Sequence, residues 1–471
     1  MSAVRDDRPG APPAGDRPGP APSAAAEAVS YRRILRIALP MVLSTATGIG
    51  SQLVVTGLIG RIGSDALYVR SVYTPIAYLF LAVTTGLGVT VQVCTAQAVG
   101  RGTPALVRRH LGSIARVGTA VLVALGGLLV LLAGPLGEAV EIEPGRSGTF
   151  HVFLAAMAGA AVLGMLGELT SSVLRGMGRT GTAAAVTALY VALNLGSIVV
   201  AGPVLGGGLM VVPCAAGAAG LVELLLGLAV LARAGIVGRA AGRAGWMPGT
   251  PGILLRVGLP VGASSIVLAV VNLLLLRIVA PFGPDVVAGF TVGSTVQTAV
   301  IVPAVGFGSA VSVLMNHQLS GGRPAAARTV FRRGLLLAAA GYALVTVVML
   351  AAGGPLAGLL SGDPAVAHQA RHFLAVVGPV FGCTGVMLCV LTVMEQVGRG
   401  LLAVLLNAGY FAAVLVIGWS VVHARHDVTA LYWTMAVAAA ASLVTGLPAA
   451  SRAALRPRLV AHGPETTEEP T

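Results

Sequence analysis

The sequence predicts an all-α integral membrane protein with twelve transmembrane helices, arranged as two homologous six-helix lobes. Three observations lead to this fold class. The 471 residues are 56% hydrophobic and 10% charged, with a mean hydropathy of +0.89, which is more apolar surface than a water-soluble fold can bury. The apolar runs are about 20 to 30 residues long. The chain also repeats itself at a fixed offset.

The apolar runs can cross a hydrocarbon core of about 30 Å as helices, because each helical residue adds about 1.5 Å. We place the first six at roughly 33–60, 67–99, 106–134, 149–174, 182–203 and 208–232. We place the second six at roughly 253–280, 286–318, 330–353, 369–394, 401–422 and 429–450.

The basic residues predict the topology. All thirty are arginine, and the net charge is +13. With a cytoplasmic N-terminus, 24 of them fall in cytoplasmic segments, and six fall outside: Arg61, Arg70, Arg146, Arg277, Arg371 and Arg425. The positive-inside rule therefore predicts a multi-pass protein of the plasma membrane with both termini in the cytoplasm. The excess of arginine reports this topology and not a nucleic-acid partner.

The internal repeat defines the two lobes. When residues 34–108 are laid over 254–328, at an offset of 220, 17 of 75 positions are identical, where composition alone gives about 7. The matched residues include Pro40 with Pro260, and the pattern Gly-x-Asp recurs at residues 63–65 and 283–285. Six helices are an even number, so both lobes enter the membrane from the same side. A pseudo-twofold axis along the membrane normal therefore relates them.

This repeat gives the predicted domains. A disordered cytoplasmic tail (1–31) precedes the N-terminal lobe (32–235), an inter-lobe linker (236–252), the C-terminal lobe (253–452) and a second cytoplasmic tail (453–471). The first tail is rich in Pro, Gly and Ala and lacks the apolar run of a signal peptide. Two rigid lobes can rock around a central cavity, which is the construction of a secondary transporter that works by alternating access.

Several segments resemble the multidrug and toxic compound extrusion (MATE) family. They are "LPMVLSTATGIGSQLVVTGLIGRIGSDAL", "GLGVTVQVCTAQAVGRG", "LRGMGRT" and "ALNLGSIVVAGP", with weaker second copies in "LPVGASSIVLAVVNLLLLRIVAPFGPD" and "MEQVGRG". The resemblance covers about residues 32–452. It implies a twelve-helix exporter of drug-like or natural-product molecules, driven by an inward flux of protons or sodium ions. No ATP is implied, and the sequence has no GxxxxGK[ST] phosphate loop.

The sequence departs from the family at three ion-coupling positions. The aspartate that bacterial members usually carry in the first helix is Val55 here. A second aspartate, four residues after Asn194, is replaced by Ile198, and a glutamate of the seventh helix is replaced by Leu268. The coupling ion therefore stays open between proton and sodium, with the proton favoured.

Three acidic residues lie within the predicted spans: Glu168, Glu223 and Glu395. An ionised carboxylate at bilayer depth costs about 2.5 to 3.5 kcal/mol, so each is a candidate functional residue. Glu395 lies one helical turn before Arg399, with which we expect it to pair. Glu168 and Glu223 lie about 10 and 15 Å from the predicted cytoplasmic surface. We therefore expect Glu223 and Glu168 to couple transport to the ion, with Glu223 binding a proton.

The predicted substrate cavity contains four uncharged polar residues. Gln52 and Asn272 are partners in the repeat, and Tyr190 and Asn194 share one face of the fifth helix. The sequence leaves open whether these side chains bind cargo or hold helices together. Arg277, near the outer end of the seventh helix, either reaches the lipid headgroups or points inward, and the second case would favour an anionic or zwitterionic cargo.

Two alternative functions remain at this stage. The first is a flippase of the same superfamily that moves lipid-linked saccharide or peptidoglycan precursors, whose phosphates suit arginine. The second is a membrane-embedded enzyme, which we do not favour because no paired acids or metal-ligand spacing lie at depth. We therefore expect no catalytic residues, no metal and no cofactor. The expected partners are a small-molecule substrate, membrane lipids and the coupling proton or sodium ion, and we expect a monomer.

Overall fold

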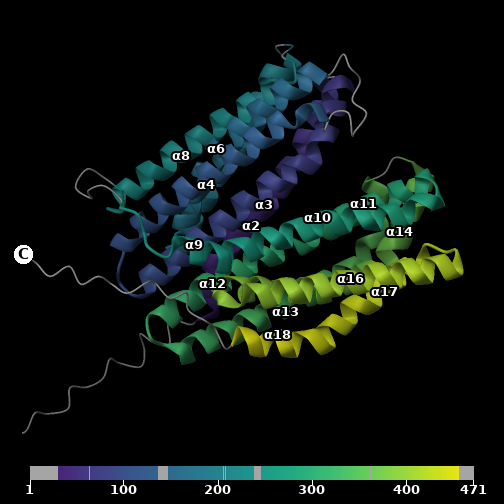
Figure 1. Ribbon diagram of the computed structural model, residues 1–471. Helices are drawn as coiled ribbons and strands as arrows, with labels where there is room; N and C mark the ends of the chain where they lie inside the picture. Colours follow the sequence, from purple (N-terminus) through teal and green to yellow (C-terminus); the bar gives the residue numbers. More distant parts are fainter. Residues whose placement is uncertain are drawn as a thin grey trace, which may run out of the picture.

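A computed structural model describes residues 30–62, 64–135, 147–204, 206, 208–237, 245–360 and 363–455 (Figure 1). Within these ranges the chain forms helices and turns, and no strand. The prediction of an all-α fold is therefore confirmed. The predicted tails, 1–31 and 453–471, lie almost wholly outside the described residues.

The helices follow the predicted apolar runs to within several residues. The first bundle contains α2 (Tyr31–Ile62), α3 (Ser64–Gly100), α4 (Ala105–Leu131), α6 (Ser147–Gly176), α7 (Thr180–Val199) and α8 (Val211–Arg233). The second contains α9 (Thr250–Ile253), α10 (Leu259–Val279), α11 (Pro284–Ile301), α12 (Pro303–Ser320), α13 (Pro324–Leu360), α14 (Pro364–Val377), α15 (Phe381–Met394), α16 (Gly400–Arg425), α17 (Thr429–Ala441) and α18 (Leu447–Ala454).

Eleven continuous segments of the described chain are long and apolar enough to span a membrane. The longest, Pro364–Arg425, contains 62 residues, more than twice the about 25 residues that one spanning helix contains at most. Its backbone leaves the helical conformation at Val397 and Gly398, between α15 and α16. Dividing this segment at the turn gives two spans in place of one, so the described chain contains twelve candidate spans.

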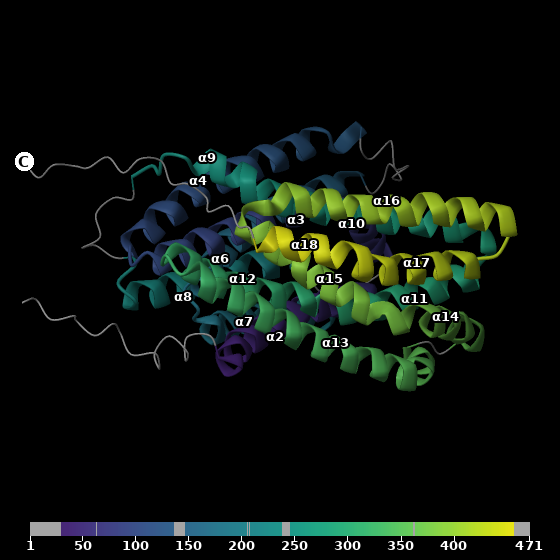
Figure 2. The same cartoon turned by 90° about the horizontal axis from the view of Figure 1, so that it is seen from below.

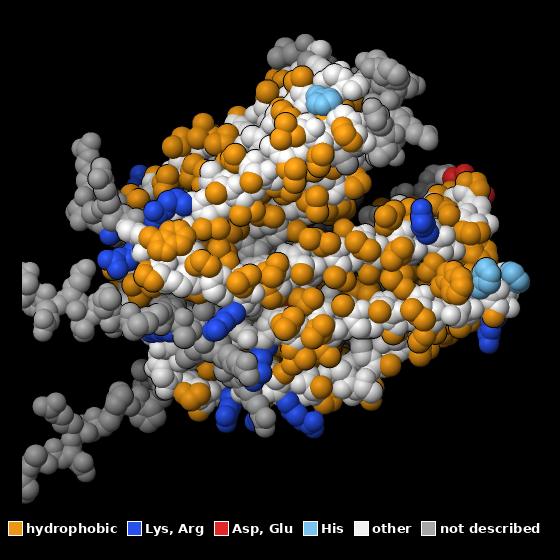
Figure 3. All heavy atoms as spheres, in the orientation of Figure 1, with side chains coloured by type: hydrophobic (Ala, Val, Ile, Leu, Met, Phe, Trp, Pro, Cys, Tyr) orange, Lys and Arg blue, Asp and Glu red, His pale blue; other side chains and the backbone are white. Residues whose placement is uncertain are grey.

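Figures 1 and 2 show the helices gathered into two elongated bundles. The bundles meet at the end where α2 begins and α18 ends, which we call the terminal end. They diverge toward the opposite end, which we call the far end (Figure 1). The space-filling view shows a notch between the bundles at the far end, and arginine side chains gathered around the terminal end (Figure 3).

The sequence repeat is also present in the backbone. Gly102 and Gly322, which are 220 residues apart, have φ angles of 72° and 73°. Gly178 and Gly398, at the same offset, have φ angles of 78° and 84°. Residues with a side chain rarely adopt this left-handed conformation, so glycine is required at both copies of each turn.

The contacts between the bundles follow the same symmetry. Helix α2 of the first bundle packs on α12, and α10 of the second bundle packs on α3. A Cβ atom added to Gly86 of α3 would lie 2.5 Å from the carbonyl oxygen of Gly258. One added to its repeat partner, Gly306 of α12, would lie 2.9 Å from the carbonyl oxygen of Met41. Both glycines therefore let the backbones of opposite bundles approach closely.

Candidate functional site

Helix α6 presents a row of polar side chains on one face. Glu168, Ser171, Ser172 and Arg175 are spaced three, four and seven residues apart, so they lie one above another. The Arg175 guanidinium forms an ion pair with Glu168 and donates a hydrogen bond to Ser172 Oγ over 2.8 Å. Ser172 Oγ in turn lies 3.3 Å from Glu168 Oε1. Glu168 is therefore held by a cation and a hydroxyl group of its own helix.

Glu223 lies near the middle of α8 and is 5% exposed. Its carboxylate accepts a hydrogen bond from Ser171 Oγ of α6 over 2.8 Å. Small residues bring the two helices together here, since a Cβ atom on Gly167 would lie 3.0 Å from Glu223 Oε2. Glu223 is therefore buried between α6 and α8, while its depth in the membrane stays a prediction. Its binding of a proton stays a prediction.

The carboxyl groups of Glu168 and Glu223 interact electrostatically with each other and with the same neighbouring side chain. Glu168 and Arg175 both interact electrostatically with Glu223. Both carboxylates also act on the hydroxyl group of Tyr190, on α7. We call Glu168, Arg175, Tyr190 and Glu223 the acid cluster. With both carboxyl groups ionised, this cluster carries two negative charges and one positive charge, so one bound proton or monovalent cation would neutralise it.

The predicted cavity residues occupy two different places. Asn194 follows Tyr190 by one turn of α7, and its side-chain oxygen is buried without a hydrogen-bond partner among the described residues. Gln52 and Asn272 are exposed, on α2 and α10. Asn272 donates a hydrogen bond to the carbonyl oxygen of Leu268, one turn earlier in its own helix, over 3.0 Å. The place of Gln52 and Asn272 in a substrate cavity stays a prediction.

The three positions where relatives carry acidic residues are apolar in structure as well as in sequence. Val55 is 6% exposed, and Ile198 is fully buried in the hydrophobic core of the first bundle. Leu268 lies on the surface of α10 and is 45% exposed. These three side chains therefore supply no carboxylate, and within the described helices α6 and α8 the carboxyl groups are those of Glu168 and Glu223.

Glu395 has a partner that the sequence did not indicate. We expected it to pair with Arg399, one turn later. In the structure its carboxylate accepts a hydrogen bond from Ser264 Oγ of α10 over 2.6 Å. The two residues are 131 positions apart. Local spacing along the helix could not reveal this contact.

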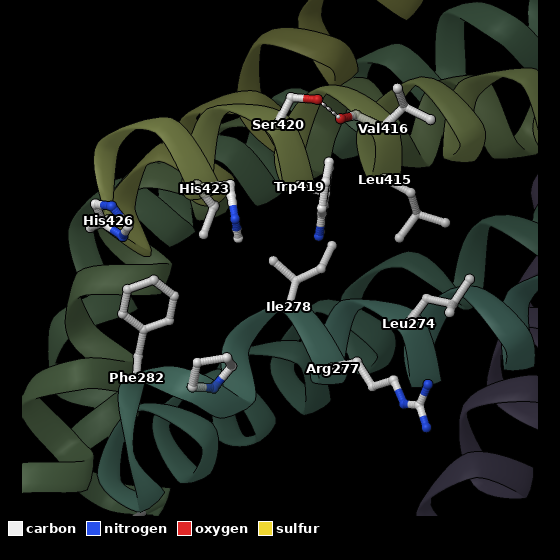
Figure 4. Close-up of a pocket in the computed structure, with 12 residues that line it drawn as sticks. Leu274, Arg277, Ile278, Phe282, Leu415, Val416, Trp419, Ser420, His423 and His426 are labelled. Atoms are coloured by element: carbon white, nitrogen blue, oxygen red, sulfur yellow. Dashed lines mark hydrogen bonds between the residues drawn. The ribbon is translucent and has the colours of Figure 1, made fainter.

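A groove of about 830 Å³ lies between the far ends of α10 and α16 (Figure 4). Arg277 lies along its α10 edge, and Trp419 and His423 point into it from α16. The rings of Trp419 and His423 stack at 5.2 Å between their centroids. Arg277 is thus part of this groove within the second bundle, and the structure does not bring it to the acid cluster.

Sequence reasoning missed a set of buried amides between the bundles. Gln92 of α3 donates a hydrogen bond to Gln396 Oε1 over 3.2 Å, and Gln97 of α3 donates to Asn316 Oδ1 of α12 over 3.1 Å. All four side chains are at most 3% exposed. Their signal in the sequence is an amide inside an apolar span, as in "VQVCTAQ" and "MEQVGRG", because buried amides require partners.

These features define an α-helical membrane protein made of two repeated bundles, with a charged cluster buried in one of them. The chain matches the MatE family over residues 40–200 and again over residues 260–420, two matches that begin 220 residues apart. The protein therefore belongs to the MatE family, whose members are transporters and not enzymes.

Two relatives illustrate this membership. The chain is 31% identical to the probable multidrug resistance protein NorM of Deinococcus radiodurans, over 71% of this chain and 74% of that protein. It is 20% identical to an FAD transporter of Shewanella oneidensis, over 80% of this chain and 84% of the relative.

Solved structures share the fold. A mutant of the Vibrio cholerae MATE transporter VcmN superposes with a TM-score of 0.85 at 18% identity, covering 93% of this chain and 99% of that chain. A transporter of the MOP superfamily from Pyrococcus furiosus superposes with a TM-score of 0.81 at 14% identity, covering 92% and 99%. These similarities establish the shared fold of the two bundles.

Proposed function

We propose that the protein is a secondary active exporter of drug-like or natural-product small molecules, driven by an inward proton gradient. It works by alternating access in the plasma membrane, as a monomer with the terminal end in the cytoplasm. The positive-inside rule supports this orientation, because arginine side chains gather at the terminal end (Figure 3). The gap between the bundles would then open to the outside.

One observation carries the proton coupling: two carboxyl groups but one guanidinium lie close enough to interact electrostatically inside the first bundle. Arg175 already pairs with Glu168, and the direct partner of Glu223 is the hydroxyl group of Ser171. The uncompensated negative charge is expensive at this depth, and a proton on Glu223 removes it. A sodium ion would need several more oxygen ligands around the same carboxylate.

We propose that the cargo site is formed by polar residues of α7, α2 and α10. The unpaired side-chain oxygen of Asn194 and the hydroxyl group of Tyr190 lie on one face of α7. Gln52 and Asn272 supply two further amides, which are exposed on α2 and α10. The similarity to a probable multidrug resistance protein supports drug-like cargo.

The deciding experiment measures efflux of a fluorescent cationic dye from proteoliposomes under an imposed proton gradient and, separately, a sodium gradient. We expect proton-driven efflux by the natural protein and a fall to background for Glu223→Gln. Asp427→Asn, which removes a negative charge from an exposed turn, is the matched control and should transport normally. Full proton-driven efflux by Glu223→Gln would refute the assignment of the proton to this residue.

The alternative is an anionic cargo, including lipid-linked saccharide or peptidoglycan precursors moved by a flippase. The exposed Arg277 in the groove between α10 and α16 favours it (Figure 4), as does the similarity to an FAD transporter. If neither gradient drives dye efflux, the same liposomes should be assayed with FAD and with a fluorescent polyprenyl phosphate. Transport of either would replace the drug-like cargo by an anionic one.

A further inference from the structure

Hydrogen bonds join the bundles at the terminal end. Gln92 and Gln97 of the first bundle donate to Gln396 and Asn316 of the second, and Asn316 in turn donates to the carbonyl oxygen of Gln396 within the second bundle over 3.1 Å. His317 Nε2 donates to the carbonyl oxygen of Gly176 over 2.8 Å. We call Gln92, Gln97, Asn316, His317 and Gln396 the polar clasp.

The polar clasp is built on the internal repeat. Gln97 and His317 are 220 residues apart, as are Gly176 and Gln396. His317 of the second bundle reaches the backbone of the turn that follows α6 in the first bundle. Gln97 of the first bundle reaches the corresponding turn of the second through Asn316. Each bundle therefore holds the same backbone position of the other.

Opening the terminal end requires three of these hydrogen bonds to break, because those of Gln92 with Gln396, Gln97 with Asn316 and His317 with Gly176 cross between the bundles. A hydrogen bond between neutral buried groups contributes about 0.5 to 1.5 kcal/mol, so a few of them can set the balance between two conformations. The polar clasp therefore stabilises the closed terminal end seen in the structure.

Arg175 connects this clasp to the acid cluster. Its Nη2 atom pairs with Glu168, while its Nε atom donates to Gln92 Oε1 over 3.3 Å. Gln92 in turn donates a hydrogen bond to Gln396 Oε1, and the side-chain nitrogen of Gln396 donates to Ser309 Oγ of α12 over 2.7 Å. One guanidinium thus links a carboxylate of the first bundle to helix α12 of the second.

We propose that Arg175 is a positioning residue that makes closure of the terminal end depend on the charge of the acid cluster. This inference rests on the proposed coupling function of that cluster. Glu168 anchors the guanidinium through an ion pair, and Glu223 interacts with it electrostatically from α8. Neutralising Glu168 removes the anchor. Gln92 then loses its oriented donor, the polar clasp weakens, and the terminal end opens.

The test measures the separation of the bundles directly. Ala105 of α4 and Ala325 of α13 are repeat partners, and both are exposed at the terminal end. Ala105→Cys and Ala325→Cys carry spin labels in a variant that lacks the four native cysteines, and pulsed electron paramagnetic resonance gives the distance distribution in nanodiscs. We expect one short distance in the otherwise natural protein. Arg175→Gln should raise the ratio of long to short distances about two- to tenfold, the factor that one hydrogen bond contributes.

Three further variants decide between a positioning role and a general loss of structure. Arg179→Gln removes an exposed arginine one turn away and should leave the distances unchanged. Gln92→Leu removes no charge and should open the terminal end as Arg175→Gln does. Glu168→Gln should open it in the natural background and add nothing in the Gln92→Leu background, because the connection is then already cut.

Two results would overturn the inference. One is an unchanged distance distribution in both Arg175→Gln and Gln92→Leu. The other is an equal effect of Glu168→Gln with and without Gln92, which would make the two residues independent. Neither measurement needs cargo or a gradient. A failure of Glu223→Gln to stop transport would therefore refute the proton assignment while leaving the distances to decide the role of Arg175.

Discussion

The two bundles repeat the same helical arrangement but carry different charged side chains at equivalent positions. Glu168, Arg175 and Glu223 form the acid cluster of the first bundle. The residues 220 positions later are Leu388, Glu395 and Leu443. A carboxyl group thus stands in the second bundle where the first has its arginine, and leucine stands where the first has its carboxyl groups.

This difference teaches that the repeat fixes the architecture while leaving the charge free to diverge. The turns at Gly178 and Gly398 keep the same left-handed backbone, because a backbone requirement constrains both copies alike. The charged side chains have no such shared requirement. Glu395 accepts a hydrogen bond from Ser264, whereas Glu168 pairs with Arg175 and Glu223 accepts a hydrogen bond from Ser171. The ion pair is therefore a feature of the first bundle that its repeat partner positions lack.

The largest effect should come from separating α6 and α8 in the first bundle. A Cβ atom on Gly220 would lie 2.9 Å from the backbone nitrogen of Gly164, so Gly220→Leu forces the helices apart. We expect loss of proton-driven efflux and a destabilisation of about 3 kcal/mol, at the upper end for overpacking. Thermal unfolding in detergent and the efflux assay measure the two effects.

The second bundle supplies the control for this prediction. Ala440 is the repeat partner of Gly220 and is exposed on α17. Ala440→Leu should therefore leave both unfolding temperature and efflux nearly unchanged. Equal damage from the two substitutions would show that the bundles do not differ in this packing.

Much of the fold follows from the sequence because its causes are local or periodic. Apolar runs of bilayer length predicted the long helices of both bundles, whereas the four-residue α9 lies almost wholly in the segment predicted as a linker. The burial of Glu223 agrees with its place in an apolar run. Long-range partners did not follow. Gln92 and Gln396 are 304 residues apart, and Glu395 and Ser264 are 131 apart, so only the packing of the bundles brings them together.

A smaller effect, equal in both bundles, should come from the glycines at the crossings between them. Gly86→Ala and Gly306→Ala each place a methyl group against the backbone of the opposite bundle. We expect each to cost about 1 kcal/mol of closure at the terminal end, which is about a fivefold rise in the open population. The spin-label distance between positions 105 and 325 measures both. An effect of only one substitution would contradict a symmetric crossing.

The smallest effect should come from Asp427, which belongs to the second bundle alone because residue 207 is glycine. Its carboxylate accepts a hydrogen bond from the backbone N–H of Thr429 over 2.9 Å, at the start of α17. This hydrogen bond holds the pKa of the exposed carboxyl below its ordinary value. Asp427→Ala should cost about 0.5 to 1 kcal/mol at neutral pH, as the loss of a helix cap does.

The pH dependence of this contribution has a definite sign. A carboxyl group whose pKa is lowered on folding stabilises the folded state fully above its unfolded pKa of about 3.9. The stabilisation is lost as the pH falls below that value toward the folded pKa. The difference in unfolding free energy between the natural protein and Asp427→Ala should therefore shrink when detergent unfolding is repeated at progressively lower pH. Asp427→Asn keeps an oxygen acceptor that cannot ionise, so its contribution should stay constant over the same range. A difference that grows on acidification would show that the carboxylate repels its surroundings in the folded state.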